Sequence, residues 1–211
     1  MAHLGMTHPL AIRQGAAALA PRLFGSVGWY AALASYPQAA MDFSMRYDKR
    51  LKSTHRFAIA DHGKVRELTI PVSRPEGAFA SGRLAWSGIL LSPHGRWWET
   101  IPTALESAYG RTPFYQYYAP KFAPLYREPA PGALLSEFLV EADTIVRAIL
   151  GLPQAADLDL PPDAADLRAI PADAPGPQAY WQVQGSPFIP GLSILDLIFN
   201  QGPESPLYLK Y

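Results

Sequence analysis

The 211-residue sequence contains no cysteine, and only 17% of its residues are charged. Without cysteine, the chain cannot form disulfide bonds, thiolate metal sites or a cysteine nucleophile. It also has no run of about 18 uncharged apolar residues, so we expect no membrane-spanning helix. Residues 1–9 lack the basic start and apolar run that are typical of a secretory signal.

Motifs of several common enzyme classes are absent as well. The sequence has no Gly-x-x-x-x-Gly-Lys-Ser/Thr phosphate loop, no Gly-x-Gly-x-x-Gly fingerprint and no Gly-x-Ser-x-Gly nucleophile turn. The five histidines do not combine with Asp or Glu at spacings typical of a metal site. These absences disfavour ATP-driven chemistry and common serine hydrolysis, and we expect neither a metal nor a cofactor.

Proline is abundant, with 22 residues, and hydrophobic residues make up 49% of the chain. A chain of this length can bury roughly 70% of the surface that it exposes when unfolded. Length alone favours one domain. We therefore expect a single domain over residues 1–211, with residues 1–9 frayed and the Pro-, Ala- and Asp-rich residues 152–178 forming a loop.

The net charge is zero, but the charges are unevenly spread along the chain. Residues 1–130 carry 15 Lys and Arg against 8 Asp and Glu, whereas residues 131–211 carry 3 against 10. One interpretation is that two halves of opposite charge dock on each other. The other is that the N-terminal part binds phosphate or carboxylate groups. The basic surplus is too small and scattered to indicate nucleic-acid binding.

Hydrophobic periodicity predicts three longer helices and one short buried helix. Their expected ranges are 27–36, 97–110, 133–151 and 193–200. Ser26 and Ser193 are the candidate N-caps of the first and last of these helices. A further short helix is expected near residues 163–168.

Alternation of apolar and polar residues predicts strands in the middle of the chain. The expected strands cover residues 39–43, 56–60, 66–72, 84–91 and 180–184. The second and third form a hairpin in which Leu68 and Ile70 face the same side. The pattern indicates an α/β fold, a single domain whose mixed sheet is covered by helices 97–110 and 133–151.

The first candidate site is the basic segment from Tyr47 to Arg56. It contains Lys49, Lys52, His55 and Arg56, and an arginine beside a lysine is well suited to hold a phosphate or carboxylate. The alternative is a solvated basic edge strand, whose charges discourage aggregation. His55 could act as a neutral base because the neighbouring positive charge disfavours its protonation, or it could be purely structural.

Two further candidates lie in the second half of the chain. Tyr109 and Arg111 could project into an aromatic pocket suited to a sugar or base ring, or Arg111 could cap the preceding helix. Asp196 and Asn200 lie four residues apart in an apolar segment, on one face of a helix. A buried carboxylate needs partners, so we expect Asp196 to pair with Arg or Lys of the basic segment. It would then anchor the C-terminus or orient the substrate as a general base.

Four blocks of the sequence, in this order, resemble the WbqC-like protein family. They are Phe24-Gly-Ser-Val-Gly-Trp-Tyr30, Tyr47-Asp-Lys-Arg-Leu-Lys-Ser-Thr-His-Arg-Phe57 with Leu68-Thr-Ile-Pro-Val72, Trp97-Trp98 through Phe114, and Phe188-Ile-Pro-Gly-Leu-Ser-Ile-Leu-Asp-Leu-Ile-Phe-Asn200. The resemblance implies a bacterial cytoplasmic protein associated with O-antigen or related glycan clusters, without an established reaction. The family pattern has a histidine where this chain has Ile101, which argues against acid–base chemistry at that position.

Together these features predict an enzyme of surface-glycan biosynthesis that transfers or modifies a group on a nucleotide-activated sugar. The predicted substrate-binding residues are Lys49, Lys52, Arg56, Arg111 and Asn200. The predicted catalytic residues are His55, Asp196 and Tyr109. The alternative is a non-catalytic protein that docks on a biosynthetic partner, and the replacement of the family histidine by Ile101 favours this second interpretation.

Overall fold

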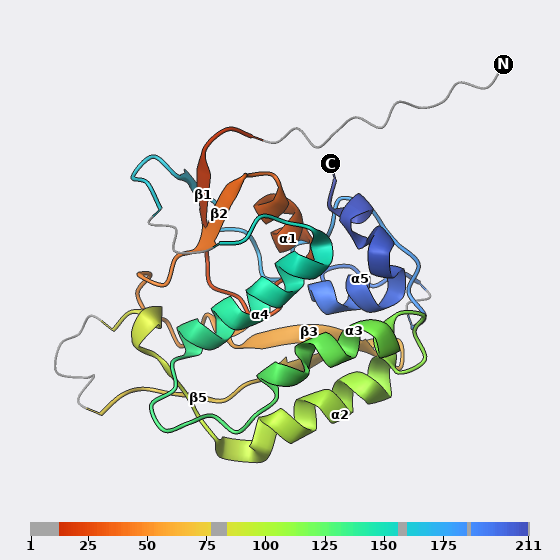
Figure 1. Cartoon of the computed structure of the whole chain (residues 1–211), viewed down its shortest axis with the longest axis horizontal. Helices are drawn as coiled ribbons and strands as arrows, with labels where there is room; N and C mark the ends of the chain where they lie inside the picture. Colours follow the sequence, from red (N-terminus) through yellow and green to blue (C-terminus); the bar gives the residue numbers. More distant parts are fainter. Residues whose placement is uncertain (1–12, 77–83, 156–159, 185–186, 211) are drawn as a thin grey trace.

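The computed structural model describes residues 13–76, 84–155, 160–184 and 187–210. Within these ranges the chain has an α/β fold, as predicted, with its strands divided between three small sheets (Figure 1). The first sheet is parallel and consists of β1 (Ala16–Leu19), β2 (Gln38–Met41) and β7 (Ala165–Asp166). β1 lies in the middle, paired with β2 on one side and β7 on the other.

The second sheet is the predicted hairpin of β3 (Arg56–Asp61) and β4 (Lys64–Thr69). The two residues at its turn, His62 and Gly63, both have positive φ angles, of 49° and 73°. Such angles let the turn follow the right-handed twist of the two strands. The third sheet pairs β5 (Val72–Ser73) with β6 (Leu90–Leu91) in antiparallel fashion.

Five α-helices and several short 3₁₀ helices occur in the described part of the chain. The α-helices are α1 (Val27–Ala34), α2 (Trp97–Tyr109), α3 (Tyr115–Phe122), α4 (Leu135–Leu150) and α5 (Ile194–Gln201). The 3₁₀ helices are η1 (Lys52–Thr54), η2 (Trp86–Gly88), η3 (His94–Arg96), η4 (Ala123–Leu125) and η5 (Gly202–Leu209). Figure 1 shows β1 and β2 next to α1 at one end of the molecule, and α2 and α3 together at the other.

The two predicted N-cap residues, Ser26 and Ser193, differ in whether the side chain forms the cap hydrogen bond. Ser26 precedes α1 as predicted, and its hydroxyl accepts a hydrogen bond from the Trp29 amide at 3.3 Å. Ser193 stands at the same position before α5, but its hydroxyl forms no cap hydrogen bond. All eight residues of α5 are buried, so this short helix forms part of the core. The predicted apolar stripe of α4 is also buried, and Gly151, with φ of 65°, ends that helix.

A buried ion pair on α4 ties this helix to the parallel sheet. Arg147 donates from Nε to Asp143 at 2.6 Å, and both side chains are almost completely buried. The remaining donors of Arg147 reach the carbonyl oxygens of Ala39 and Pro153, and Tyr30 donates to Asp143 at 2.9 Å. Because every charged atom of this pair has a partner, the pair fixes α4 against α1 and β2.

Three secondary-structure predictions are wrong. Residues 84–91 form a strand only at Leu90–Leu91, because the chain turns through η2 just before it. Residues 180–184 form no strand, since the Val183 amide donates to the Asn200 side chain rather than to another strand. Residues 163–168 contain the strand β7 instead of a helix. The predicted fraying of residues 1–9 lies outside the described residues.

No helix in the described part of the chain is both long and apolar enough to cross a membrane.

Candidate functional site

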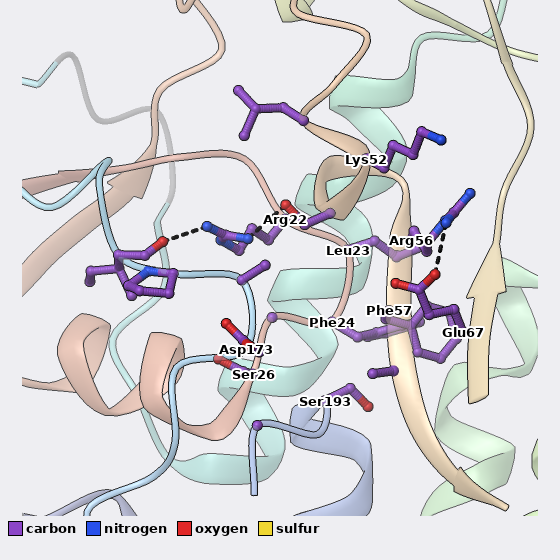
Figure 2. A pocket seen from close by; sticks show the side chains of 18 of the residues that line it. Arg22, Leu23, Phe24, Ser26, Lys52, Arg56, Phe57, Glu67, Asp173 and Ser193 are labelled. Atoms are coloured by element: carbon purple, nitrogen blue, oxygen red, sulfur yellow. Dashed lines mark hydrogen bonds and ion pairs between the residues drawn. The ribbon is translucent and has the colours of Figure 1, made fainter. Parts of the chain in front are cut away.

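A cavity of about 520 Å³ lies beyond the carboxyl ends of β1 and β7 (Figure 2). The loop after β1, residues 22–26, forms its floor, and the loop after β7, residues 168–173, forms one wall. Residues 50–53 and 56–58, around η1 and the start of β3, form the opposite wall. The volume is within the range of about 300–1,000 Å³ that is usual for small-molecule sites.

The position of the cavity follows from the order of the parallel strands. From β1 the chain passes through α1 to β2 on one side, whereas β7 pairs on the other side of β1. The loops that leave β1 and β7 therefore enclose a crevice at the carboxyl edge of the sheet. Open α/β sheets bind their ligands at such a switch in strand order.

Arg22 is the buried cation of the cavity, with a relative exposure of only 5%. Its Nη1 donates to the Ser53 hydroxyl at 2.7 Å, and its Nη2 donates to the Ile170 carbonyl at 2.5 Å. Its Nε has no hydrogen-bond partner among the described residues. Burial lowers the pKa of Arg22, and the charge of Asp173 opposes that effect. An arginine stays protonated under these conditions, so a buried positive charge with an unused donor is available.

The floor of the cavity also contains a hydroxyl, that of Ser193, without a partner in the described part of the chain. Ser26 and Ser193 pair in an isolated β-bridge, which brings the starts of α1 and α5 together. The Ser193 hydroxyl is buried, and no described residue is its hydrogen-bond partner. Next to this bridge, Phe24 has a φ angle of 43°, a left-handed conformation that is strained for a bulky residue. Such strain is common where a backbone turn shapes a functional site.

Two further cations lie at the rim of the cavity. Lys52 is exposed, and Arg56 is partly buried. Arg56 pairs through Nη1 with Glu67 at 2.7 Å, while its buried Nε has no partner within the described ranges. Arg50 also lines this wall, but it pairs with Asp48 at 2.9 Å.

Asp173 supplies the carboxylate that Figure 2 shows near Arg22 and Ser26. Two glycines leave room for the segment around Asp173 to pack closely. A Cβ atom at Gly28 would lie 2.3 Å from the Pro175 carbonyl oxygen, and one at Gly191 would lie 2.5 Å from that of Asp173. The segment that carries Asp173 can therefore pack directly on the first turn of α1, where the Gly28 amide donates to the Ala174 carbonyl at 3.2 Å.

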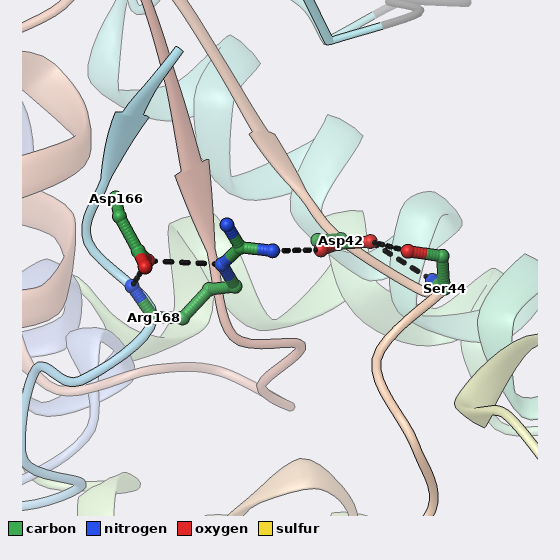
Figure 3. A network of polar contacts seen from close by, with 4 residues as sticks. All are labelled: Asp42, Ser44, Asp166 and Arg168. Atoms are coloured by element: carbon green, nitrogen blue, oxygen red, sulfur yellow. Dashed lines mark hydrogen bonds and ion pairs between the residues drawn. The ribbon is translucent and has the colours of Figure 1, made fainter. Parts of the chain in front are cut away.

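The loop after β7 is anchored by a second polar network (Figure 3). Arg168 donates from Nη1 to Asp42 at 2.6 Å and from Nε to Asp166 at 2.9 Å. Asp42 follows β2 directly and also accepts a hydrogen bond from the Ser44 amide at 2.9 Å. Arg168 lines the cavity, but these contacts give it the structural role of joining the ends of β2 and β7.

The structure brings only part of the predicted site together. Lys52 and Arg56 line the cavity, and Lys49 is an exposed residue of the same segment that does not line it. His55 does not line it either, because its Nδ1 is hydrogen-bonded to the Ile70 carbonyl at 2.8 Å. Burial lowers the pKa of His55, and the nearby charges of Arg56 and Lys52 lower it further, against the effect of the Ile70 carbonyl.

Asp196 and Asn200 lie in a separate buried cluster. Oδ2 of Asp196 accepts hydrogen bonds from the Tyr180 hydroxyl at 2.7 Å and from Gln182 Nε2 at 2.8 Å. The predicted ion pair with the basic segment is therefore wrong, since neutral donors take its place. Asn200 is also committed to structure, because its Oδ1 accepts from the Val183 amide at 2.9 Å. Both side chains hold segment 180–184 against α5.

Tyr109 and Arg111 do not form the expected aromatic pocket. Tyr109 is buried, and its hydroxyl accepts a hydrogen bond from the Ala60 amide at 3.0 Å. Burial raises the pKa of Tyr109, and the charge of Asp196 raises it further. Arg111 is exposed, and neither residue lines the cavity. Tyr109 lies beside Asp196, but neither residue lines the cavity that Lys52 and Arg56 line, so the predicted site residues do not share one pocket.

Sequence reasoning missed Arg22, Asp173 and Ser193 as cavity residues. Arg22 had a usable signal, because it is the single charge between the apolar β1 and the apolar α1. Asp173 had no such signal, since it lies in a Pro-, Ala- and Asp-rich segment that has the composition of a plain loop. No group of three or more His, Asp or Glu side chains in the described ranges could hold a metal ion.

A comparison with protein-family models matches residues 21–160 of this chain to the WbqC-like protein family. The matched range contains Arg22, Lys52 and Arg56, and it ends before Asp173 and Ser193. Comparisons with the curated proteins and with the solved structures found no match.

Proposed function

This chain belongs to the WbqC-like protein family, and on that premise we propose that it is an enzyme of bacterial surface-glycan biosynthesis. It binds a nucleotide-activated sugar in the cavity and transfers or modifies a group on that sugar. The observation that carries this proposal is the buried Arg22 at the carboxyl edge of the parallel sheet, which lines a ligand-sized cavity and has one donor, Nε, without a partner among the described residues. The proposal places the protein in the cytoplasm, as the resemblance implies.

Three cations suit the cavity to the phosphate groups of such a ligand. Arg22 lies at the floor, and Lys52 and Arg56 lie at the rim. A guanidinium with a free Nε donates to a phosphate oxygen in a fixed direction, and a lysine adds a mobile point charge. The Ser193 hydroxyl gives the floor a further donor. Buried donors without partners are costly in the free protein, so an anion that accepts from them gains affinity.

Asp173 is the carboxylate of the cavity that is best placed to accept a proton. It is exposed and lies near Arg22, so it can reach a ligand that the arginine holds. In a group transfer it would remove the proton of an attacking hydroxyl as a general base. Asp173 would thus perform the acid–base chemistry that the sequence predicts for His55 and Asp196, which lie outside the cavity.

A second candidate function is non-catalytic binding of the same anionic ligand by a protein that docks on a biosynthetic partner. The observation in its favour is Ile101, at the position of the family histidine, which is buried with an exposure of 3%. No acid–base group can act from that side chain. Under this alternative the cavity binds its ligand, but Asp173 performs no chemistry.

A thermal-shift screen with UDP-, dTDP- and GDP-sugars, followed by analysis of products, tests both candidates. We expect saturable stabilisation by at least one nucleotide sugar, and affinity about tenfold weaker in Lys52→Met. Lys49→Met is the matched control, because Lys49 lies in the same segment outside the cavity. Turnover that is lost in Asp173→Asn supports the enzyme. Binding without turnover supports the second candidate, and no binding of any nucleotide sugar contradicts both.

A further inference from the structure

A second cavity, of about 320 Å³, lies between α2 and α3. Pro102 and Leu105 of α2 line one side, Ala119 of α3 lines the other, and Phe199 of α5 contributes from the core. Figure 1 shows these two helices side by side at the end of the molecule away from β1 and β2. This cavity shares no lining residue with the one around Arg22.

The described residues leave one buried polar atom of this mainly apolar lining without a hydrogen-bond partner. The hydroxyl of Tyr126 is buried, and none of the described residues is hydrogen-bonded to it. Burial is the main cause that raises the pKa of Tyr126, with the nearby Tyr115 as the second, so this phenol is protonated at neutral pH. Nearly all buried polar side chains in folded proteins have a partner, and an unpartnered donor needs an explanation.

The chemistry of the lining limits what can occupy the cavity. Tyr115, whose ring packs edge-on against Phe199 at 5.0 Å between centroids, has a pKa raised to about 12, mainly by burial and then by Glu106. It is therefore neutral, and none of the described residues that line the cavity carries a formal charge. A charged ligand would lose its hydration here without gaining a counterion, which is costly. A neutral, mainly apolar molecule with one hydrogen-bond acceptor fits both the lining and the unused donor.

We propose that the cavity between α2 and α3 is a second ligand site, which binds a small, neutral, mainly apolar carbonyl compound. The carbonyl oxygen accepts a hydrogen bond from the Tyr126 hydroxyl, and the apolar part packs against Leu105, Ala119 and Phe199. This site does not depend on the function proposed for the cavity around Arg22, since the two cavities have separate linings. It can be occupied whether or not a nucleotide sugar is bound.

A matched pair of probes tests this proposal on the full chain. Acetophenone and isopropylbenzene have the same size and branching, but only acetophenone offers a carbonyl oxygen. In NMR titrations we expect both to shift signals of α2 and α3. Acetophenone should bind Tyr126→Phe about fivefold more weakly than the wild type, as expected for the loss of one neutral hydrogen bond, because its carbonyl is then buried without a donor. Isopropylbenzene should bind the two proteins equally well, since it has no acceptor to lose a donor. Ala119→Phe fills the cavity, and both probes lose their binding.

Two results would overturn the proposal. If neither probe shifts the signals of α2 and α3 in the wild-type protein, the cavity does not admit such ligands. Acetophenone affinity that is unchanged in Tyr126→Phe would show that the Tyr126 hydroxyl is not the donor. The Tyr126→Phe variant removes only one oxygen atom that forms no hydrogen bond within the described chain, so we expect it to fold normally.

Discussion

Arg22 donates to the hydroxyl of Ser53 at 2.7 Å, and this contact joins the loop after β1 to the basic segment at η1. The two residues are 31 positions apart, so the hydrogen bond holds the floor of the cavity to its opposite wall. The other end of the guanidinium is held by the Ile170 carbonyl in the loop after β7. One buried arginine thus connects all three segments that enclose the candidate site.

Replacing Arg22 by Lys tests this role, because it keeps the charge and removes the planar set of donors. We expect Arg22→Lys to lower the free energy of unfolding by about 1–3 kcal/mol, since the Ile170 carbonyl and the Ser53 hydroxyl lose their donor. Affinity for a nucleotide sugar should fall at least tenfold. Urea unfolding and calorimetric titration measure the two effects. Arg66→Lys, in the hairpin outside the cavity, is the control and should change neither.

Asp196 should make the stability of the protein depend on pH. Burial is the main cause that raises its pKa above the ordinary 3.8, and the hydrogen bonds from Tyr180 and Gln182 offset part of that effect. The folded state therefore binds this proton more tightly than the unfolded state, so stability falls as pH rises from 3.8 through the raised pKa. Asp196→Asn removes this dependence, and we expect it to be at least as stable as the wild type at pH 7.

The measurement is urea unfolding of both proteins from pH 4 to pH 8. The free-energy difference between Asp196→Asn and the wild type should grow with pH in favour of the variant. Glu204→Gln, an exposed carboxylate in η5, should show no such trend. A variant that is strongly destabilised at pH 7 would contradict this account of Asp196. If Asp196→Asn instead lost all turnover while its free energy of unfolding stayed that of the wild type, Asp196 would be a catalytic residue.

The buried pair of Asp143 and Arg147 predicts a large, purely structural effect. Arg147→Met leaves the Asp143 carboxylate buried with Tyr30 as its remaining partner among the described residues, and it removes the donors of the Ala39 and Pro153 carbonyls. We expect a loss of about 3–5 kcal/mol in the free energy of unfolding. Arg127→Met on the surface, which breaks the exposed pair with Glu141, should cost far less. Equal losses in the two variants would contradict this assignment.

Gly28 is predicted to control the position of Asp173. A Cβ atom there would lie 2.3 Å from the Pro175 carbonyl and 2.6 Å from that of Ala174, so Gly28→Ala must push this segment away from α1. We expect a loss of about 1–3 kcal/mol in stability and weaker ligand binding. Gly88→Ala is a matched control, because its Cβ would meet only the flexible Leu84 side chain at 3.2 Å. If Gly28→Ala binds the ligand as tightly as the wild type, the segment does not contribute to the site.

Much of the helical structure could be predicted from the sequence, because local signals and burial agree there. The apolar stripe of α4 and its end at Gly151 are examples, as is the cap of α1 at Ser26. The strand β1 was not predicted, since its sequence Ala-Ala-Ala-Leu has no alternation and is buried throughout. Such a fully buried parallel strand carries no period-two pattern.

The candidate site was predicted only where its residues form a local cluster. Lys52 and Arg56 lie in a visibly basic segment and do line the cavity. Arg22 and Asp173 are brought together by the parallel pairing of β1 with β7, which are more than 140 residues apart in the chain. Asp196 was misassigned because its sequence shows a buried carboxylate but not its partners, Tyr180 and Gln182. Long-range strand pairing decided the first outcome, and side-chain hydrogen bonds between segment 180–184 and α5 decided the second.

An NMR titration of the isotope-labelled protein with UDP and with inorganic pyrophosphate tests the central claim most directly. If the cavity holds the anionic part of the ligand, both probes will produce saturable shifts of the backbone amides at residues 22–26, 50–53, 56–58 and 168–173. These shifts should weaken in Lys52→Met and persist in Lys49→Met. Saturable shifts confined to other parts of the protein, or no saturable shift with either probe, would contradict the claim.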